Sequence, residues 1–229
     1  MPPTAPEKQE RLHPARFIDH TLLAPTATSA GVITLCEEAV EHDFAAVCIP
    51  PRYVSLAAER LYGSEVRVAT VVGFPCGYNS LRQKIQETVE LVAAGAEEID
   101  MVVTLAHLFE GRLDLLEEEI AQVVLAAQQA PVKVIIECCF LDTAQKIAAT
   151  QRAVAAGAAF VKTSTGFGPS GATLADVQLL VAAGAGQIAV KAAGGIRSWQ
   201  ECEKFLAAGA DRIGTSAGVA IMQQWQLAG

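Results

Sequence analysis

The chain has 229 residues, and its 17 basic and 25 acidic side chains give a net charge of −8 at pH 7. This acidity argues against nucleic acid or an anionic membrane surface as a partner, because both are bound through basic side chains. Hydrophobic residues make up 52% of the chain and its mean hydropathy is +0.32. The composition therefore excludes a mainly disordered protein and is sufficient for a large core.

The first fifteen residues, MPPTAPEKQERLHPA, are polar and contain four prolines, without the apolar segment of a secretory signal. The uncharged, largely apolar stretch of residues 177–190 is interrupted by glutamine and glycine and is too short for a membrane span. The six cysteines are scattered and form no C-x-x-C motif, so a disulfide framework is not expected. We expect a cytoplasmic protein with reduced thiols and no membrane partner.

A short pattern recurs along the chain: an apolar helix end, then Ala-Gly-Ala, then a strand-like run. It occupies residues 91–103, 153–164, 180–195 and 205–218. The glycine suits the left-handed position that ends a helix, and the apolar run after it suits a buried parallel strand. The pattern therefore indicates repeated helix-to-strand units.

Further strand-like runs bring the predicted number of strands to eight. They lie near residues 16–20, 45–49, 66–72, 98–103, 132–137, 159–163, 186–191 and 211–215. With amphipathic helical segments between them, they predict an α/β fold: a single (β/α)8 TIM barrel over residues 16–229, preceded by a short N-terminal extension, residues 1–15. A doubly wound open sheet is the alternative.

A charged residue follows an apolar residue at the ends of four successive predicted strands. Asp100, Glu137, Lys162 and Lys191 occupy these places. In a barrel the carboxyl ends of the strands surround the active site, and alternation along each strand points these four side chains inward. Two structural ion pairs that cap the core would give the same pattern. A lone lysine after a strand is usually structural, but two lysines on adjacent strands with a carboxylate on the same side favour a functional site.

Two lysines on neighbouring strands would repel each other. Adjacent strands lie about 4.8 Å apart, so two ammonium groups about 5 Å apart repel by about 3 kcal/mol at an effective dielectric of about 20. This repulsion would lower the pKa of one lysine by about two units. A neutral amine is a nucleophile toward carbonyl groups and forms a Schiff base, so the pair predicts covalent aldehyde chemistry.

Small residues and hydroxyl groups follow three neighbouring strands. The segments are 163–168, Gly194-Gly195 and 214–218. Loops after the seventh and eighth strands of such barrels often bind phosphate through backbone N–H groups, which glycine leaves accessible. Tight turns alone would also use these residues, and Arg197 could either add charge or simply begin a helix. We predict a phosphate site here.

At these positions the sequence resembles the deoxyribose-phosphate aldolases, from about Phe17 to Met222. The motifs that carry the resemblance are IDHTLLAPTAT (18–28), VCIPPRYV (47–54), VATVVGFPCG (68–77), EIDMVV (98–103), FVKTSTGFGPSGAT (160–173), VKAAGGIR (190–197) and RIGTSAG (212–218). The resemblance implies reversible cleavage of 2-deoxy-D-ribose 5-phosphate to D-glyceraldehyde 3-phosphate and acetaldehyde. It implies a Schiff-base lyase on a (β/α)8 barrel without metal or other cofactor.

The resemblance also implies a role for individual residues. Lys162 would form the Schiff base, Lys191 would perturb it and help to move protons, and Asp100 would act in the acid/base relay. Asp19 would be an accessory member of that relay. Substrate and phosphate contacts would come from Cys48, Gly166, Gly194, Gly195, Gly214 and Ser216. Glu137 stays outside this set, as a charge partner behind the site.

The partners expected from the resemblance are a phosphosugar and small aldehydes, and the protein is expected to be a homo-oligomer, with a dimer favoured. Thr104, Pro50 and Cys138 stand where many relatives have other residues, and a C-terminal tyrosine common in the family is missing. Two other functions stay open. One is a phosphosugar isomerase that forms no covalent adduct, and the other is a phosphosugar-binding protein without activity.

Overall fold

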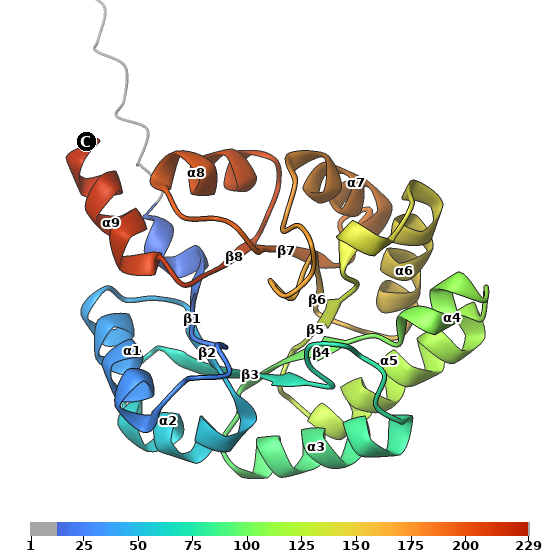
Figure 1. Cartoon of the computed structure of the whole chain (residues 1–229), viewed down its shortest axis with the longest axis horizontal. Coiled ribbons are helices and arrows are strands. Elements are labelled where there is room, and N and C mark those ends of the chain that lie inside the picture. Colours follow the sequence, from blue (N-terminus) through green and yellow to red (C-terminus); the bar gives the residue numbers. More distant parts are fainter. Residues whose placement is uncertain (1–12, 229) are drawn as a thin grey trace, which may run out of the picture.

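Eight parallel strands form a closed barrel in the computed structural model, which describes residues 13–228 (Figure 1). Each strand pairs with its neighbours in chain order, and β1 pairs with β8 to close the ring. The helices surround the barrel on the outside (Figure 1). The predicted (β/α)8 barrel is confirmed, and the open-sheet alternative is wrong because no strand is left at an edge.

The strands are β1 (Ile18–Thr21), β2 (Ala46–Ile49), β3 (Arg67–Val72), β4 (Glu98–Val102), β5 (Val132–Ile135), β6 (Phe160–Lys162), β7 (Ala189–Ala193) and β8 (Arg212–Thr215). The α-helices are α1 (Ser29–Glu41), α2 (Val54–Arg60), α3 (Leu81–Ala93), α4 (Leu105–Phe109), α5 (Leu113–Ala127), α6 (Thr143–Ala155), α7 (Leu174–Gly184), α8 (Trp199–Ala207) and α9 (Gly218–Leu227). Every predicted strand overlaps an observed one.

The glycine of the recurring pattern has two structural roles: it ends a helix in three copies and allows close packing in another. Gly95, Gly157 and Gly209 follow helices α3, α6 and α8 with φ of 105°, 78° and 99°, as the pattern predicts. In the third copy the prediction is wrong, because Gly184 is still helical and Ala185 takes the left-handed conformation with φ of 47°. A Cβ on Gly184 would lie 2.6 Å from Cγ2 of Ile188, so close packing explains this glycine.

Strand side chains alternate between two environments. Val47, Ile99, Val134, Val161 and Val190 belong to the large core between the barrel and its helices, and each is at most 1% exposed. Residues one position away face the barrel interior. Alternation with period two thus separates an apolar outer core from the interior, which holds the chemistry.

The barrel interior has two unlike sides. Strands β2 and β3 contribute a separate buried cluster of small apolar side chains, namely Ala46, Cys48, Ala69 and Val71. Strands β1 and β4 to β8 contribute most of the buried charges, as described below. We call the β2–β3 cluster the apolar side of the barrel.

Of the predicted extension, residues 1–12 lie outside the described residues. The short 3-10 helix η1 (Pro14–Phe17) follows, with Pro14 and Ala15 buried against the barrel. No helix within residues 13–228 combines the length and apolarity that a membrane crossing requires.

Candidate active site

Lys162 and Lys191 lie side by side in the barrel, because their Cα atoms are register partners on β6 and β7. Both side chains are buried, at 3% and 0% exposure. Their Nζ atoms donate to the same oxygen, Oδ2 of Asp100 on β4, at 2.8 Å and 2.7 Å. The structure thus brings together the three residues that alternation placed at the barrel mouth.

Lys133 is a third buried lysine in this cluster. It lies on β5, where it is the register partner of Asp100. Its Nζ atom is 2.6 Å from Oδ1 of Asp100 and 2.7 Å from Oε2 of Glu98. Both oxygens of Asp100 are therefore engaged by lysines, so the orientation of the carboxylate is fixed.

Sequence reasoning missed Lys133, although the signal was present. The charged residue at the end of the predicted strand is Glu137, and Lys133 lies earlier in the same strand. Two residues before the strand end, the same alternation also points Lys133 inward. Glu98, two residues before Asp100, was missed for the same reason.

Asp19 on β1 completes the network from the other side. It forms an ion pair with Lys191 and a second one with Arg212 on β8. Arg212 also contacts Glu98 at 3.3 Å. The interior therefore holds three carboxylates and four cations in one connected network, which we call the charged side: Asp19, Glu98, Asp100, Lys133, Lys162, Lys191 and Arg212.

These contacts fix the charge states of the carboxylates. Burial alone would raise the pKa of Asp100, but Lys133, Lys162 and Lys191 outweigh it and hold that pKa well below its usual value. The pKa of Asp19 is likewise lowered, because Lys191, Lys133 and Arg212 overcome the effect of burial. Both groups are carboxylates at neutral pH.

The pKa of Lys191 is raised, although repulsion from a neighbouring lysine would lower it. Burial favours a lower pKa for Lys191, but Asp100 and Asp19 outweigh burial and the pKa is raised. The sequence argument counted the two ammonium groups and left out the carboxylate between them. Lys191 is therefore a cation with two anionic partners, whereas Lys162 has only Asp100 as a hydrogen-bond partner among the described residues.

Lys162 also lines a cavity of about 290 Å3 at the barrel mouth. The rest of the cavity lining comes from the end of β1 with the segment after it, residues 21–24, and from the ends of β7 and β8 with the loops after β6, β7 and β8. All the glycines and the serine that sequence analysis assigned to phosphate binding lie on this cavity: Gly166, Gly194, Gly195, Gly214 and Ser216. Arg197 and Thr165 line it as well.

Two of these glycines leave open space beside the backbone. Gly166 has φ of 88° and Gly195 has φ of 85°, and a Cβ on either would meet no atom within 4 Å. Gly194 has φ of 90° and packs so tightly that its Cβ would lie 2.9 Å from Cα of Gly171. Positive φ favours glycine at all three positions, and the accessible backbone suits an anion.

Cys48 lies on β2, on the apolar side of the barrel, and is fully buried. Burial raises the pKa of its thiol, and the Asp100 carboxylate raises it further. The side chain is therefore a neutral thiol at pH 7, which does not suit a nucleophile. Cys48 does not line the cavity beside Lys162 that is described above.

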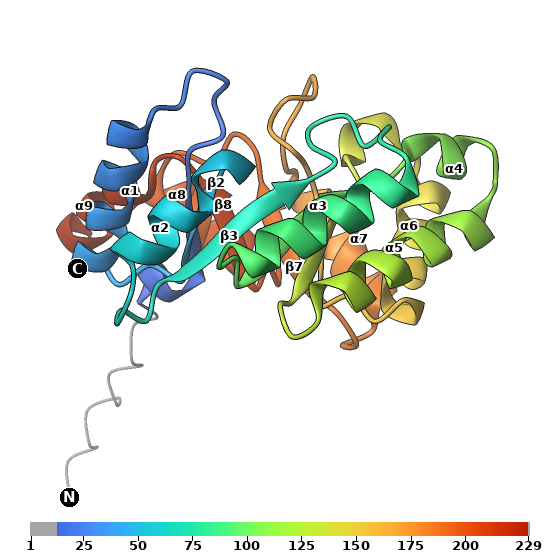
Figure 2. The same cartoon turned by 90° about the horizontal axis from the view of Figure 1, so that it is seen from below.

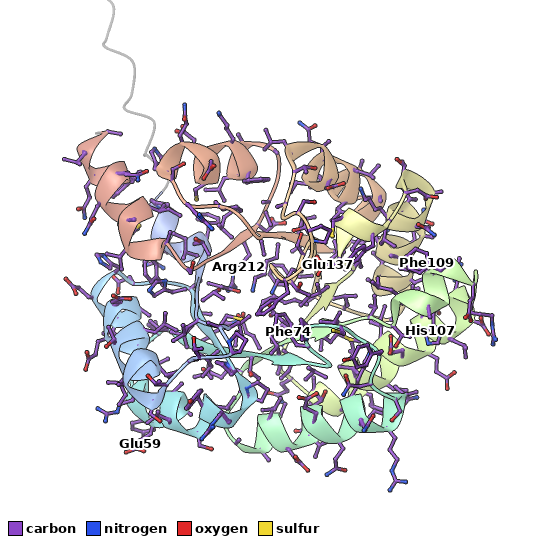
Figure 3. The ribbon with its side chains drawn as sticks, viewed as in Figure 1. Glu59, Phe74, His107, Phe109, Glu137 and Arg212 are labelled. Atoms are coloured by element: carbon purple, nitrogen blue, oxygen red, sulfur yellow. The ribbon has the colours of Figure 1, made fainter. Side chains whose placement is uncertain are left out.

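Glu137 does not join the charged side. Strand β5 ends at Ile135, and Glu137 adopts a left-handed conformation with φ of 50° in the following turn. Its carboxylate accepts hydrogen bonds from the backbone N–H and the hydroxyl of Thr165, three residues after Lys162. Figure 3 shows Glu137 beside the barrel mouth. Its predicted inward place is therefore wrong, and its contacts fix the loop after β6.

Two of the residues that depart from the family pattern are structural. The hydroxyl of Thr104 donates to Glu119 at 2.7 Å and accepts from Lys84 at 3.2 Å. Pro50 precedes a 3-10 helix, η2 (Pro51–Tyr53). Within residues 13–228, neither Thr104 nor Pro50 forms a hydrogen bond or ion pair with the charged side.

A family model described as "DeoC/LacD family aldolase" matches residues 15–224. The chain belongs to the DeoC/LacD family of aldolases. The match covers the whole barrel, so the resemblance stated from the motifs is confirmed. The prediction of an aldolase, an enzyme of the lyase class, is confirmed with it.

Individual members of this family agree over nearly their full length. The deoxyribose-phosphate aldolase of Syntrophotalea carbinolica is 54% identical over 93% of this chain and 96% of its own. A solved structure from Coccidioides immitis, provisionally named a deoxyribose-phosphate aldolase, has a TM-score of 0.92 at 41% identity, over 93% of this chain and 86% of the other. The deoxyribose phosphate aldolase of Aeropyrum pernix, described as a unique tetramer, has a TM-score of 0.88 at 33% identity, over 93% and 91% of the two chains.

Proposed function

We propose that this aldolase cleaves 2-deoxy-D-ribose 5-phosphate reversibly to D-glyceraldehyde 3-phosphate and acetaldehyde. Lys162 would form a Schiff base with the aldehyde carbon of the sugar. The observation that carries the proposal is the position of Lys162, between a buried cation–carboxylate network and a glycine-lined cavity. The names of relatives such as the Syntrophotalea carbinolica enzyme support this substrate.

The first half of the reaction needs a neutral amine. Lys162 Nζ gives up a proton and attacks carbon 1 of the open-chain sugar, which forms a carbinolamine. Loss of the hydroxyl group as water then gives an iminium ion. Asp100 touches the Nζ atoms of both Lys162 and Lys191, so it can accept and return the proton with Lys191 as the acid.

The second half breaks the bond between carbons 2 and 3. A base removes the proton of the 3-hydroxyl group, the bonding electrons move into the iminium ion, and glyceraldehyde 3-phosphate leaves an enamine on Lys162. Protonation of the enamine at carbon 2 and addition of water release acetaldehyde and restore the amine. Asp100 and Lys191 are the groups beside Lys162 that support these transfers.

Asp19 would act through Lys191. It forms an ion pair with Lys191 and with Arg212, and it touches no other lysine within hydrogen-bond distance. Its carboxylate keeps Lys191 charged and oriented while Asp100 accepts and returns the proton. We therefore assign Asp19 a positioning role in the proton relay.

The phosphate group would bind at the loops after β6 to β8. Backbone N–H groups of glycine-rich turns favour an anion, and Gly166 and Gly195 leave the approach open. A phosphate held at Gly166, Gly194, Gly195, Gly214 and Ser216 places the sugar chain along the cavity toward Lys162. Cys48 would border the carbon chain from the apolar side.

Reduction with borohydride tests the proposal. With 2-deoxy-D-ribose 5-phosphate present, borohydride is expected to inactivate the enzyme and to leave a secondary amine at Lys162, located by peptide mass mapping. The Lys162→Met variant is the matched control and should gain no mass. A phosphosugar isomerase would turn over without trapping, and a binding protein would do neither, so either outcome would contradict the aldolase mechanism.

Oligomeric state and location are also proposals. We propose a homo-oligomer in the cytoplasm, with a dimer as the expected state, although the Aeropyrum pernix relative is described as a tetramer. Analytical ultracentrifugation of the purified protein would distinguish a dimer from a tetramer or a monomer.

A further inference from the structure

Two phenylalanines meet over the barrel mouth. Phe74 follows β3 and Phe167 follows β6, three strands away around the ring. Their ring centroids are 5.3 Å apart and their planes are at 89°, which is an edge-to-face contact. Figure 2 shows the loops after β3 and β6 rising side by side above the barrel. The pair therefore bridges two loops that have no strand pairing with each other.

Phe74 covers the apolar side of the barrel. Its ring packs on the cluster of Ala46, Cys48, Ala69 and Val71, together with Leu23. Figure 3 shows Phe74 toward the middle of the barrel, whereas Phe109 lies far out on α4. Leu23, which packs on the same cluster, also lines the cavity beside Lys162, so the apolar side reaches that cavity.

The loop that carries Phe74 is held at both ends. The N–H of Gly73 donates to Oε2 of Glu87 at 2.9 Å, and the N–H of Gly77 donates to the carbonyl of Gly73 at 2.8 Å. A Cβ on Gly77 would lie 2.1 Å from the carbonyl oxygen of Val103, so this turn packs directly on the end of β4. These contacts hold the backbone on both sides of Phe74 in place.

Phe167 is the exposed partner of the pair. Its side chain is 49% exposed, it lies between Gly166 and Gly168, and it lines the same cavity as Lys162. Its backbone N–H donates to the hydroxyl of Thr165 at 3.0 Å, and that hydroxyl in turn bonds to Glu137. The backbone is therefore anchored before Phe167, and Gly168 after it packs closely, since a Cβ there would lie 2.8 Å from Sγ of Cys139.

We propose that Phe74 and Phe167 form an aromatic lid that sets the size of the donor aldehyde, the two-carbon fragment bound to Lys162. This inference rests on the proposed function. The phosphate-bearing fragment needs the polar loops after β6 to β8, while the two-carbon fragment has no charge and fits the apolar side. The lid closes that side, so it limits the donor to a small aldehyde and keeps water away from carbon 2 of the enamine.

Donor preference is the property to measure. The addition reaction is run with glyceraldehyde 3-phosphate as acceptor and either acetaldehyde or propanal as donor, for wild type, Phe167→Ala, Phe74→Ala and the double variant. Each single variant is expected to shift the ratio of kcat/KM values toward propanal by about tenfold, because one methylene distinguishes the donors. The double variant should shift it little further, since the rings act as one unit.

A second measurement is the rate at which acetaldehyde exchanges its methyl hydrogens with solvent through the enamine. In D2O with acetaldehyde alone, the variants are expected to exchange methyl hydrogens at least about threefold faster relative to aldol addition, because an open site admits solvent to carbon 2. Phe167→Leu, which keeps an apolar side chain, should recover most of the wild-type ratio. Phe109→Ala is the matched control, since Phe109 is 57% exposed on α4 and should change neither readout.

Outcomes for the lid and for the proposed function are separable. If borohydride traps wild-type Lys162 but all lid variants keep the wild-type ratio of kcat/KM for the two donors, the lid proposal is wrong and the proposed aldolase function is supported. If wild-type Lys162 is never trapped, the proposed function fails. Because Phe74 is half-buried, Phe74→Leu and urea unfolding of each variant separate a change of donor preference from a loss of fold.

Discussion

Lys84 and Lys162 are two buried lysines paired with carboxylates in two different regions. Lys84 lies on α3, against α5 and the end of β4, and is 0% exposed. Its Nζ atom contacts Glu119 at 2.6 Å, the carbonyl of Val102 at 2.7 Å and the hydroxyl of Thr104 at 3.2 Å. Three acceptors use all three protons of an ammonium group.

Lys162 differs from Lys84 in what its ammonium group leaves unused. Among residues 13–228 it has one acceptor, Oδ2 of Asp100, and it borders the cavity at the barrel mouth. Burial and an anionic partner are common to both lysines, so neither property identifies a reactive amine. The number of unsatisfied protons and the access to a cavity distinguish them.

The largest effect should come from Lys162→Met. We expect the rate of deoxyribose phosphate cleavage to fall by at least about 10⁴-fold, because no other described amine both lines the cavity and can form the Schiff base. The free energy of unfolding should change much less, since methionine fills most of the space and Asp100 keeps Lys133 and Lys191. Steady-state rates and urea titrations check this. Near-normal turnover would show that Lys162 is not the reactive lysine.

Lys84→Met should show the opposite pattern. Removing one partner of a buried ion pair leaves Glu119 without its cation, which costs about 3–5 kcal/mol of unfolding free energy. The fraction that remains folded should still be trapped at Lys162 by borohydride. Urea titration followed by mass mapping tests both statements, and a stable variant that cannot be trapped would reverse the roles of the two lysines.

Lys133→Met should have an intermediate effect, mainly on the pH dependence. Among the charges near Asp100, Lys133 does most to hold its pKa down. Without Lys133 the pKa of Asp100 rises, so activity should be lost at a higher pH on the acid side of the profile. We expect kcat to fall by about 10²-fold.

The KM for deoxyribose phosphate should change little in Lys133→Met, because Lys133 does not line the cavity. A pH profile of kcat/KM measures the shift. An unchanged acid limb would show that Lys133 only fills space.

The smallest effect concerns four cysteines to which no chemistry is assigned, three of them buried and one exposed. Burial raises the pKa of Cys36 to about 11 and those of Cys138 and Cys202 to about 12, so these thiols stay protonated in the folded protein. Cys76 is exposed on the loop after β3.

Titration with a disulfide reagent at pH 8 should therefore label Cys76 quickly and the other three only on unfolding. Mass mapping identifies the labelled residue, and rapid labelling of Cys202 would show that the helix–barrel core opens readily. The Cys76→Ser variant controls for the fast phase.

Local patterns were enough for the fold and for three residues of the site. Repeated helix-to-strand units predicted all eight strands, and alternation placed Asp100, Lys162 and Lys191 together. Asp19 came from the family resemblance alone. The pairing of Asp19 with Lys191 joins β1 to β7 across 172 residues of sequence, and no local pattern carries that information.

The remaining contacts depend on geometry that short sequence patterns do not specify. The left-handed turn at Glu137 decides that its carboxylate meets Thr165 instead of the lysines. The contact of Phe74 with Phe167 depends on the paths of two loops from distant strands. The raised pKa of Lys191 depends on its contacts with Asp100 and Asp19, which repulsion between two neighbouring lysines does not include.

The described chain begins and ends at the same place on the barrel. The His13 ring lies 4.7 Å from the Trp225 ring, and η1 packs against α9. Every strand of the closed barrel pairs with two neighbours, so the barrel has no edge strand. A circular permutant that joins the segments at His13 and Trp225 by a short linker is therefore expected to fold. New termini at residues 185–188, between α7 and β7, would lie away from the loops around Lys162.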